Sequence, residues 1–304
     1  MKGCYMYIKK ISNLYNSTSL IEGKVPYLKI NKFDSCKDIL AVFSTRLGGV
    51  SKGQFTSMNF CTPLGDSIEN VRKNFELFSK ATGLKNFVLS KQTHTTNVKK
   101  VSISDIEKGL YKEMDYDNVD GLVTNEKGIT LSTFYADCVP LYFYDPVHSA
   151  IGLSHAGWRG TVNNMVKATL DKMNIEFSTN PRDVICAIGP SICVDCYEVS
   201  EDVAKEFIIA FDIKEIPKYS KDNNKINSYE NRHIVYKKDN DKYMLNLWIA
   251  NYTNMLKSGV LDENISFPDI CTCENKEIMF THRGLNGKRG NLGAFLMIKT
   301  ENSN

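Results

Sequence analysis

The stretch Ile129–Gly160, ITLSTFYADCVPLYFYDPVHSAIGLSHAGWRG, decides the fold class of this chain. It contains three apolar runs, Ile129–Phe134, Val139–Tyr144 and Ala150–Ser154, which are separated by short turns. Short runs of this kind predict successive β-strands. After Gly160 the apolar residues recur at helical spacing, so a helix is expected there. The stretch therefore indicates a domain that mixes strands and helices.

The same alternation extends in both directions from this stretch. Asp66–Leu84 has apolar residues on one helical face and begins with Asp66 or Ser67, which predicts a capped amphipathic helix. Further helices are expected over Ser200–Phe211 and Leu245–Lys257. Further strands are expected at Ile39–Thr45, Phe87–Lys91, Gly121–Thr124, Val184–Ile188, and near 267–272, 277–281 and 293–299.

The domain organisation predicted from this map is simple. Residues 1–30 form a polar N-terminal segment, and residues 31–300 form a single α+β domain without internal repeats. Residues 213–243 are rich in Lys, Asn and Asp and poor in apolar side chains, so they are expected to form an exposed excursion from that domain.

Composition excludes several functional classes. A chain of 304 residues with 42% apolar residues is long enough to bury a real core. A formal net charge of +3 does not favour binding to nucleic acid or to an anionic membrane. No apolar stretch approaches the length of a membrane span, and the start MKGCYMYIKK lacks a signal peptide's apolar region. A cytoplasmic protein is expected, and the sequence does not determine its oligomeric state.

Nine cysteines and only five histidines give a second clue. In a long chain without a secretory signal, scattered cysteines favour free thiols or metal ligands over a disulfide framework. Three segments place such a ligand beside a turn, namely Lys91–His94, Ala136–Pro140 and Ser154–Gly160. His94, Cys138 and His155 would form a three-ligand zinc site with an open fourth position. The alternative is a buried thiol with two hydrogen-bonded histidines.

Two arginine-containing segments are candidate anion sites. Arg159 lies in HAGWRG at a strand-to-helix junction, where a helix N-terminus and a guanidinium would favour an anion such as phosphate. Arg283 follows His282, a possible acid or base, and precedes a glycine-rich loop. The alternatives are a tight turn with a solvated arginine and an ordinary polar loop.

A different set of thiols competes for a metal. Cys193 and Cys196 are spaced C-x-x-C, and Cys271 and Cys273 are spaced C-x-C. Together they would form a structural four-thiolate zinc site, although the second spacing is shorter than usual. Unrelated buried cysteines are the alternative.

Taken together, these segments resemble one family, which includes the bacterial peptidoglycan editing factor and vertebrate laccase-domain-containing proteins. Its members were formerly described as multicopper polyphenol oxidases. The resemblance covers roughly residues 40–300 and is carried by the motifs Ser44–Ser51, Ser57–Phe60, Lys91–His94, Asp120–Thr124, Ala136–Pro140, His155–Gly160, Ile188–Pro190, Tyr197–Val199, Cys271–Thr272 and Arg283.

The resemblance implies a layered α/β/β/α arrangement with mixed β-sheets and one zinc ion held by His94, Cys138 and His155. It implies phosphorolysis of adenosine, inosine, guanosine and methylthioadenosine, and deamination of adenosine. Purine nucleosides and phosphate would then be the partners of the site. Arg46, Asn59, Arg159 and Arg283 match polar family positions, and we expect them to bind substrate.

Other readings of the resemblance stay open. Editing of peptidoglycan precursors would use the same cysteine and histidine to hydrolyse an amino acid from a nucleotide-linked sugar. A purine-binding protein with a vestigial site is the non-enzymatic alternative. A four-copper oxidase needs more imidazoles than five histidines supply, although one copper ion could replace zinc adventitiously. Thr95 and His282 depart from the family pattern at the rim of the site, which affects substrate preference rather than the metal.

Overall fold

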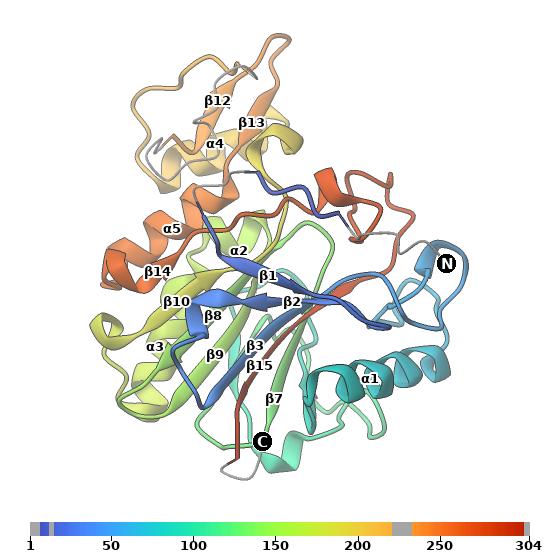
Figure 1. Cartoon of the computed structure of the whole chain (residues 1–304). Coiled ribbons are helices and arrows are strands. Elements are labelled where there is room, and N and C mark those ends of the chain that lie inside the picture. The colour runs from blue at the N-terminus through green and yellow to red at the C-terminus, as the bar shows by residue number, and fades with distance from the viewer. Residues whose placement is uncertain (1–6, 12–14, 221–232, 301–304) are drawn as a thin grey trace.

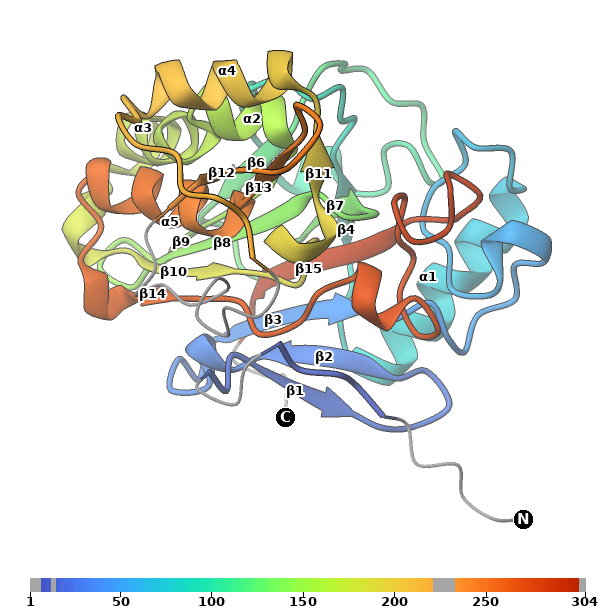
Figure 2. The ribbon, with the colours of Figure 1, turned by 90° about the horizontal axis from the view of Figure 1, so that it is seen from above.

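Two six-stranded sheets pack face to face in the computed structural model, which describes residues 7–11, 15–220 and 233–300 (Figures 1 and 2). The first sheet has the order β1-β2-β3-β15-β7-β4 and the second β14-β10-β8-β9-β6-β5. Both sheets mix parallel and antiparallel pairs. The α+β class and the mixed sheets expected from the sequence are therefore confirmed.

The strands and helices have the following bounds. The first sheet consists of β1 (Thr18–Ile21), β2 (Tyr27–Ile30), β3 (Ile39–Ser44), β15 (Leu292–Ile298), β7 (Thr130–Tyr135) and β4 (Phe87–Leu89). The second consists of β14 (Ile265–Ser266), β10 (Ile185–Ile188), β8 (Val139–Asp145), β9 (Ala150–Ala156), β6 (Gly121–Thr124) and β5 (Val98–Lys100). A three-stranded sheet contains β11 (Glu198–Val199), β13 (Tyr243–Leu245) and β12 (Val235–Lys237). The helices are α1 (Ile68–Thr82), α2 (Trp158–Val162), α3 (Met165–Phe177), α4 (Glu201–Ala210) and α5 (Leu247–Lys257).

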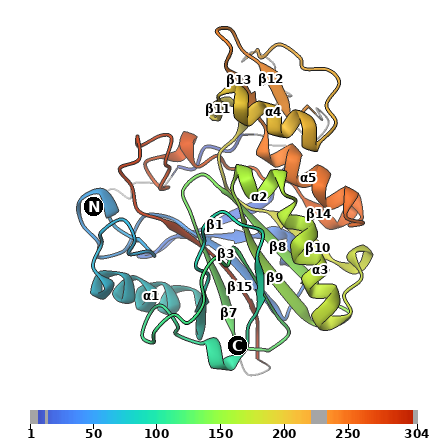
Figure 3. The same cartoon turned by 180° about the vertical axis from the view of Figure 1, so that it is seen from behind.

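Helices cover the outer face of each sheet. Helix α1 packs Phe75 and Phe78 against Phe295 of β15, with Phe78 and Phe295 ring centroids 4.8 Å apart. Its N-cap is Ser67, whose side chain accepts a hydrogen bond from the Asn70 N–H. Helices α3 and α5 share an apolar core with the outer face of the second sheet. Figure 3 shows α2 and α3 beside β9, on the opposite side of the molecule from α1. The layers follow the α/β/β/α order.

The connection between β7 and β8 positions the functional site. Strand β7 lies in the first sheet and β8 in the second, so the turn between them crosses from one sheet to the other. Asp137 in this turn has φ of 88°, in the left-handed region that side chains other than glycine rarely adopt. The crossing places Ala136–Cys138 between the C-terminal end of β7 in one sheet and the N-terminal end of β8 in the other.

Several predicted segments differ from the structure. Residues 277–281 form no strand, because Ile278 and Met279 donate backbone hydrogen bonds to Asn275 in a turn and their apolar side chains fill the inter-sheet core instead. Within the N-terminal segment, β1 and β2 extend the first sheet, because β1 pairs with β2 and β2 pairs with β3.

The expectation of an exposed excursion over 213–243 is wrong for residues 234–236, whereas residues 237–242 are exposed as expected. Ile234, Val235 and Tyr236 are buried, because β12 pairs with β13 and packs against α4. Residues 221–232 of this segment lie outside the described residues. In the part of the chain that the structure describes, no helix combines the length and the apolarity needed to cross a bilayer.

Candidate metal centre

His155 and Cys138 come together through strand pairing. Strands β8 and β9 are antiparallel neighbours, with Pro140 opposite His155 and Val139 opposite Ala156. Cys138 immediately precedes β8, so its side chain lies near the end of β9 where His155 stands. The His155 side chain is almost fully buried, whereas Cys138 is partly exposed. Two ligands separated by 17 positions in the chain are thus brought together by one hairpin.

His94 reaches the same place from a loop that Asp120 organises. The Asp120 carboxylate accepts hydrogen bonds from the backbone N–H groups of Thr93, His94 and Thr95, each at 3.0 Å. These three contacts stabilise the loop although His94 has φ of 66°. Asp120 stands next to β6, which pairs with β9, and its backbone carbonyl accepts from the His155 N–H at 2.7 Å. One carboxylate therefore fixes two of the three predicted ligands.

The ligand atoms are spaced as a metal requires. One ring nitrogen of each histidine and the Cys138 Sγ lie within 4.8 Å of one another, and Cys138 Sγ lies 4.0 Å from His94 Nε2. Tetrahedral zinc, with Zn–N of about 2.0–2.1 Å and Zn–S of about 2.3 Å, places ligand atoms roughly 3.3–3.8 Å apart. His155 Nδ1 lies 2.9 Å from Asp120 Oδ1, which leaves Nε2 for the metal. The donor set fits a catalytic zinc site.

The charges of the cluster favour a thiolate. Burial raises the pKa of Cys138, but His155 and His94 outweigh this effect and lower the pKa to about 6. Burial also raises the pKa of Asp120, while its hydrogen bonds with His155, Thr93 and Thr95 lower it to about 2. At neutral pH the cluster therefore holds an ionised thiol and an ionised carboxylate, and the ionised thiol is the form that binds metals.

A cavity of about 450 Å³ opens onto the three ligands. Its walls are mainly apolar and come from the loop before α1, from α1 itself and from the ends of β4 and β7. Lining side chains include Phe60, Leu64, Ile68, Val71, Leu89, Met114 and Phe134. The polar lining includes Ser90, Gln92, Arg289 and Asn291. A largely apolar cavity with a few convergent polar groups is typical of a small-molecule site.

Arg289 is a cationic lining residue of this cavity that the sequence did not single out. Its Nη1 donates to Asn291 Oδ1 and lies 3.4 Å from the Gly290 carbonyl oxygen. Its Nε is buried and has no hydrogen-bond partner among the described residues. Burial lowers the pKa of Arg289, whereas Cys138, Asp137 and Cys61 raise it. The guanidinium therefore lies close to the metal ligands with a donor available for an anion.

The four residues predicted to bind substrate lie elsewhere around the site, since none of them lines this cavity. Arg46 lies over the Phe280 ring and donates to the carbonyls of Thr56 and Lys276. Asn59 accepts from the N–H groups of Cys61 and Asn291, so it positions two lining residues.

Arg159 and Arg283 form an outer group beside the centre. Arg159 is exposed and lies over the Trp158 ring, and Arg283 lies over Tyr197 and donates to the Glu198 carbonyl. His282 is also exposed. Burial and then Cys138 raise the pKa of Tyr197, while Arg283 and Arg159 lower it, so this group lies near the metal ligands. A substrate role for these residues stays a prediction.

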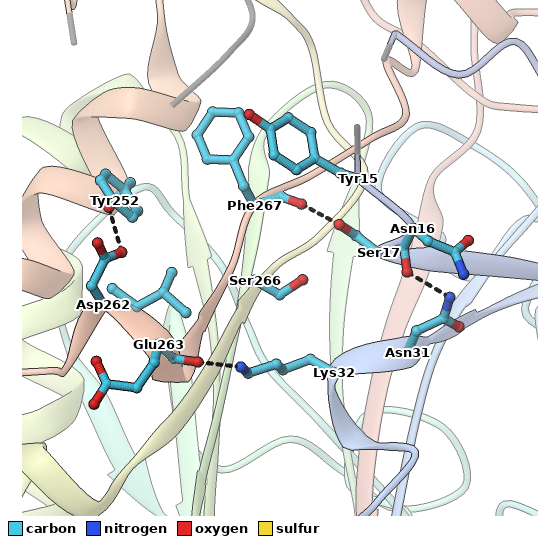
Figure 4. Close-up of a pocket in the computed structure, with 11 residues that line it drawn as sticks. Tyr15, Asn16, Ser17, Asn31, Lys32, Tyr252, Asp262, Glu263, Ser266 and Phe267 are labelled. Carbon is cyan, nitrogen blue, oxygen red and sulfur yellow. Dashed lines mark hydrogen bonds between the residues drawn. The ribbon is translucent and has the colours of Figure 1, made fainter. Parts of the chain in front are cut away.

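A second cavity of about 640 Å³ lies on another part of the molecule (Figure 4). It is lined by Tyr15, Asn16, Ser17, Asn31, Lys32, Tyr252, Asp262, Glu263, Ile265, Ser266 and Phe267. Its polar groups are largely paired with one another, because four hydrogen bonds connect lining residues: Lys32 Nζ donates to the Glu263 carbonyl, Tyr252 Oη to Asp262, Asn31 Nδ2 to the Asn16 carbonyl and Ser17 Oγ to the Phe267 carbonyl. It has no thiol or imidazole among its lining residues, whereas the three candidate metal ligands line the first cavity.

Known proteins resemble this chain over most of its length. Residues 40–299 match the family model described as multi-copper polyphenol oxidoreductase laccase. Purine nucleoside phosphorylase YlmD of Bacillus subtilis (strain 168) is 32% identical over 86% of this chain and 90% of its own length. Adenosine deaminase RL5, from an unknown prokaryotic organism, is 30% identical over 88% of this chain and 99% of its own length.

A solved structure extends the likeness to the fold. The hypothetical protein YfiH of Bacillus licheniformis superposes with a TM-score of 0.81 at 27% identity, covering 94% of this chain and all of the other. The matched family segment contains every strand of the central sandwich except β1, β2 and part of β3, together with the three candidate ligands. The chain belongs to the family described as multi-copper polyphenol oxidoreductase laccase.

Proposed function

We propose that this chain is a zinc-dependent purine nucleoside phosphorylase that also deaminates adenosine. The single observation that carries the proposal is the His94, Cys138 and His155 cluster at one end of a cavity large enough for a nucleoside. Relatives named purine nucleoside phosphorylase and adenosine deaminase support the same substrate class. Adenosine, inosine, guanosine and methylthioadenosine are the expected substrates.

His94, Cys138 and His155 would hold the zinc ion. When bound, zinc supplies a Lewis acid and lowers the pKa of a coordinated water towards neutrality. The Asp120 carboxylate accepts a hydrogen bond from His155 Nδ1, so that Nε2 remains available as a ligand. Two imidazoles and one thiolate are a donor set suited to zinc, and they are too few for a four-copper oxidase. One copper ion bound adventitiously at the same three ligands would be consistent with the oxidase description of the family.

Two kinds of surface in the cavity would contact different parts of the substrates. The apolar walls around Phe134 and Met114 would enclose the purine and exclude water. Arg289, with its unpartnered buried Nε, would bind phosphate by charge-assisted hydrogen bonds. Placing phosphate against the ribose in this way makes the displacement effectively unimolecular. Deamination needs no phosphate, so Arg289 serves only one of the two reactions.

The test combines metal analysis with product analysis. Purified protein is incubated with adenosine, with and without phosphate, and the products are separated by chromatography. Zinc in the protein, adenine that forms only with phosphate, and inosine that forms without it are the expected results. Zinc with neither product would instead favour hydrolysis of a peptidoglycan precursor.

Two cysteine variants sharpen the test. Cys138→Ala removes a ligand and should abolish both activities together with the zinc ion of this centre. Cys36→Ala, also at a partly exposed thiol but remote from the cavity, should retain both. Full turnover by Cys138→Ala after loss of zinc would overturn the proposed metal mechanism.

A further inference from the structure

Three thiols form a second cluster that the proposed reaction does not use. The Sγ atoms of Cys193, Cys196 and Cys271 all lie within 4.8 Å of one another. Cys193 and Cys271 are fully buried, and Cys196 is partly exposed. In a tetrahedral zinc site with Zn–S of about 2.3 Å, the sulfur atoms are roughly 3.8 Å apart. The cluster therefore needs to contract by about 1 Å at most to enclose a zinc ion.

The backbone already arranges these thiols as ligands. Cys193 and Cys196 flank a single turn, closed by the Cys196 N–H donating to the Cys193 carbonyl at 3.2 Å. A C-x-x-C turn directs two thiols to one side, which is a common zinc-ligand spacing. Cys271 comes from a distant segment that is held beside the turn by backbone pairing with Ser191. Two separate segments thus converge on one point.

The cluster differs from ordinary buried cysteines. The Cys271 sulfur accepts a hydrogen bond from the Cys193 N–H at 3.3 Å, a contact that favours a thiolate. Cys186 on β10 is the contrast, because it is buried alone and burial raises its pKa. A single buried thiol behaves as a small hydrophobe.

We propose that Cys193, Cys196 and Cys271 bind a structural zinc ion, separate from the ion assigned to His94, Cys138 and His155. The fourth ligand is a neighbour of Cys196. Glu274 Oε1 lies 3.8 Å from Cys196 Sγ, and the Cys273 thiol also interacts with Cys196. Three thiolates with a fourth thiolate or a carboxylate are donors that zinc accepts.

This zinc ion would stabilise the turn that carries Cys138. Thr272, next to Cys271, donates its hydroxyl to Asp137 Oδ1 at 2.6 Å. The other Asp137 oxygen accepts from the Arg283 N–H at 2.7 Å, and the Asp137 carbonyl accepts from the Ile192 N–H. The two segments that the metal joins therefore also hold the left-handed turn between β7 and β8. The second zinc ion would therefore act on the proposed catalytic centre indirectly, by stabilising the turn that carries Cys138.

Metal stoichiometry tests the proposal. By mass-spectrometric metal analysis after extensive dialysis, we expect two zinc ions in the purified wild-type chain and one in Cys193→Ala. Cys186→Ala, a matched change at an equally buried thiol, should keep both ions. Cys273→Ser and Glu274→Gln distinguish the fourth ligand by which of them weakens the second ion. One zinc ion in the wild type that is retained in Cys193→Ala would overturn the proposal.

A measurement on the unaltered chain covers the case in which Cys193→Ala does not fold. Zinc-edge X-ray absorption reports the mean number of sulfur ligands per zinc ion. The proposed pair of sites predicts two or more sulfurs per zinc ion, because a three-thiolate or four-thiolate site is averaged with a one-thiolate site. A mean of one sulfur ligand per zinc ion is expected if zinc binds only at the centre formed by His94, Cys138 and His155. A mean of one sulfur, or a disulfide between Cys193 and Cys271 in protein purified without air, would overturn the proposal.

Discussion

Asp120 shows how much the proposed metal centre depends on a residue that is not one of its three proposed ligands. It accepts three backbone N–H groups from the His94 loop and the Nδ1 proton of His155. Carboxylates that orient a ligating imidazole commonly change metal affinity about 10–100-fold when they are removed. The sequence placed Asp120 in a motif without giving it a role, because its hydrogen bonds connect segments far apart in the chain.

The first prediction concerns this carboxylate. Asp120→Asn should weaken zinc binding roughly 10–100-fold, since an amide cannot provide the charge that orients His155. Competition with a chromogenic chelator measures the affinity. Asp117→Asn, at an exposed carboxylate that forms an ion pair with Lys91 Nζ, is the control and should bind zinc normally. Equal affinities in the two variants would show that Asp120 does not position the ligand.

Arg289 gives the second prediction. Arg289→Lys should raise the KM for phosphate roughly tenfold or more, because charge-assisted hydrogen bonds of about 1.5–3 kcal/mol are lost with the planar fork of donors. Deamination of adenosine, which uses no phosphate, should change little. Steady-state kinetics of both reactions on one preparation measure the split. Equal losses in the two activities would assign Arg289 to the wall of the cavity rather than to phosphate.

The sequence analysis predicted Arg283, and not Arg289, as a substrate-binding residue, and this choice has a physical explanation. Both arginines belong to one polar, glycine-rich segment, and which of them faces the cavity depends on the path of the loop. Gly290 follows Arg289 where a Cβ atom would lie 2.8 Å from the Phe280 ring and 2.9 Å from Asn59 Oδ1. That close approach constrains the path of the loop beside Arg289, and it depends on packing that no local pattern encodes.

At the scale of secondary-structure elements, the junction between β9 and α2 sets the geometry of the ligands. Gly157 joins His155 to the helix, and a Cβ atom there would lie 2.8 Å from His94 Cδ2 and 3.2 Å from Cys138 Sγ. Its φ of −69° suits any residue, so the requirement for glycine is steric rather than conformational. The motif HAGWRG thus contains a glycine that makes room for two ligands.

The third prediction tests this close approach. Gly157→Ala should leave the fold intact and weaken zinc binding at least severalfold, because the added methyl group displaces His94 or Cys138. Gly160→Ala is the matched control, since its Cβ atom would meet nothing closer than 3.5 Å. Circular dichroism checks the fold and chelator competition checks the metal. Normal zinc affinity in Gly157→Ala would mean that the ligands lie farther from this junction.

The positions of the strands and helices were largely predictable from the sequence, but the pairing of the strands into sheets was not. The runs Ile129–Phe134, Val139–Tyr144 and Ala150–Ser154 correspond to β7, β8 and β9. Local alternation cannot show that β7 belongs to one sheet and β8 to the other, because sheet pairing is set by distant segments such as β15. The same limit explains residues 277–281, whose apolar side chains are buried without forming a strand.

At the scale of the whole molecule, two buried tyrosines join the sheets in opposite directions. Tyr142 of β8 donates its hydroxyl to the Val42 carbonyl of β3 at 3.0 Å. Tyr135 of β7 donates to the Ser154 carbonyl of β9 at 3.1 Å. Both lie in the inter-sheet core, where an unpaired hydroxyl would be costly. The sandwich is therefore held by apolar packing and by two polar links that fix how the sheets align.

The last prediction separates stability from metal binding with these two residues. Tyr142→Phe should lower the free energy of unfolding by about 1 kcal/mol, the net value of one buried hydrogen bond, because the ring packing is retained. Tyr135→Phe should lower it by about 2 kcal/mol, because the Tyr135 hydroxyl also forms a hydrogen bond with the buried Thr133 hydroxyl at 2.8 Å. Tyr135 differs in that its ring lies 5.4 Å from the His155 ring and its hydroxyl holds the carbonyl just before that ligand. Zinc affinity should therefore fall in Tyr135→Phe and stay unchanged in Tyr142→Phe. Urea denaturation of the metal-free proteins and chelator competition measure the two quantities independently. If both variants lost zinc affinity equally, the alignment of the whole sandwich, rather than the Tyr135 contact, would control the metal centre.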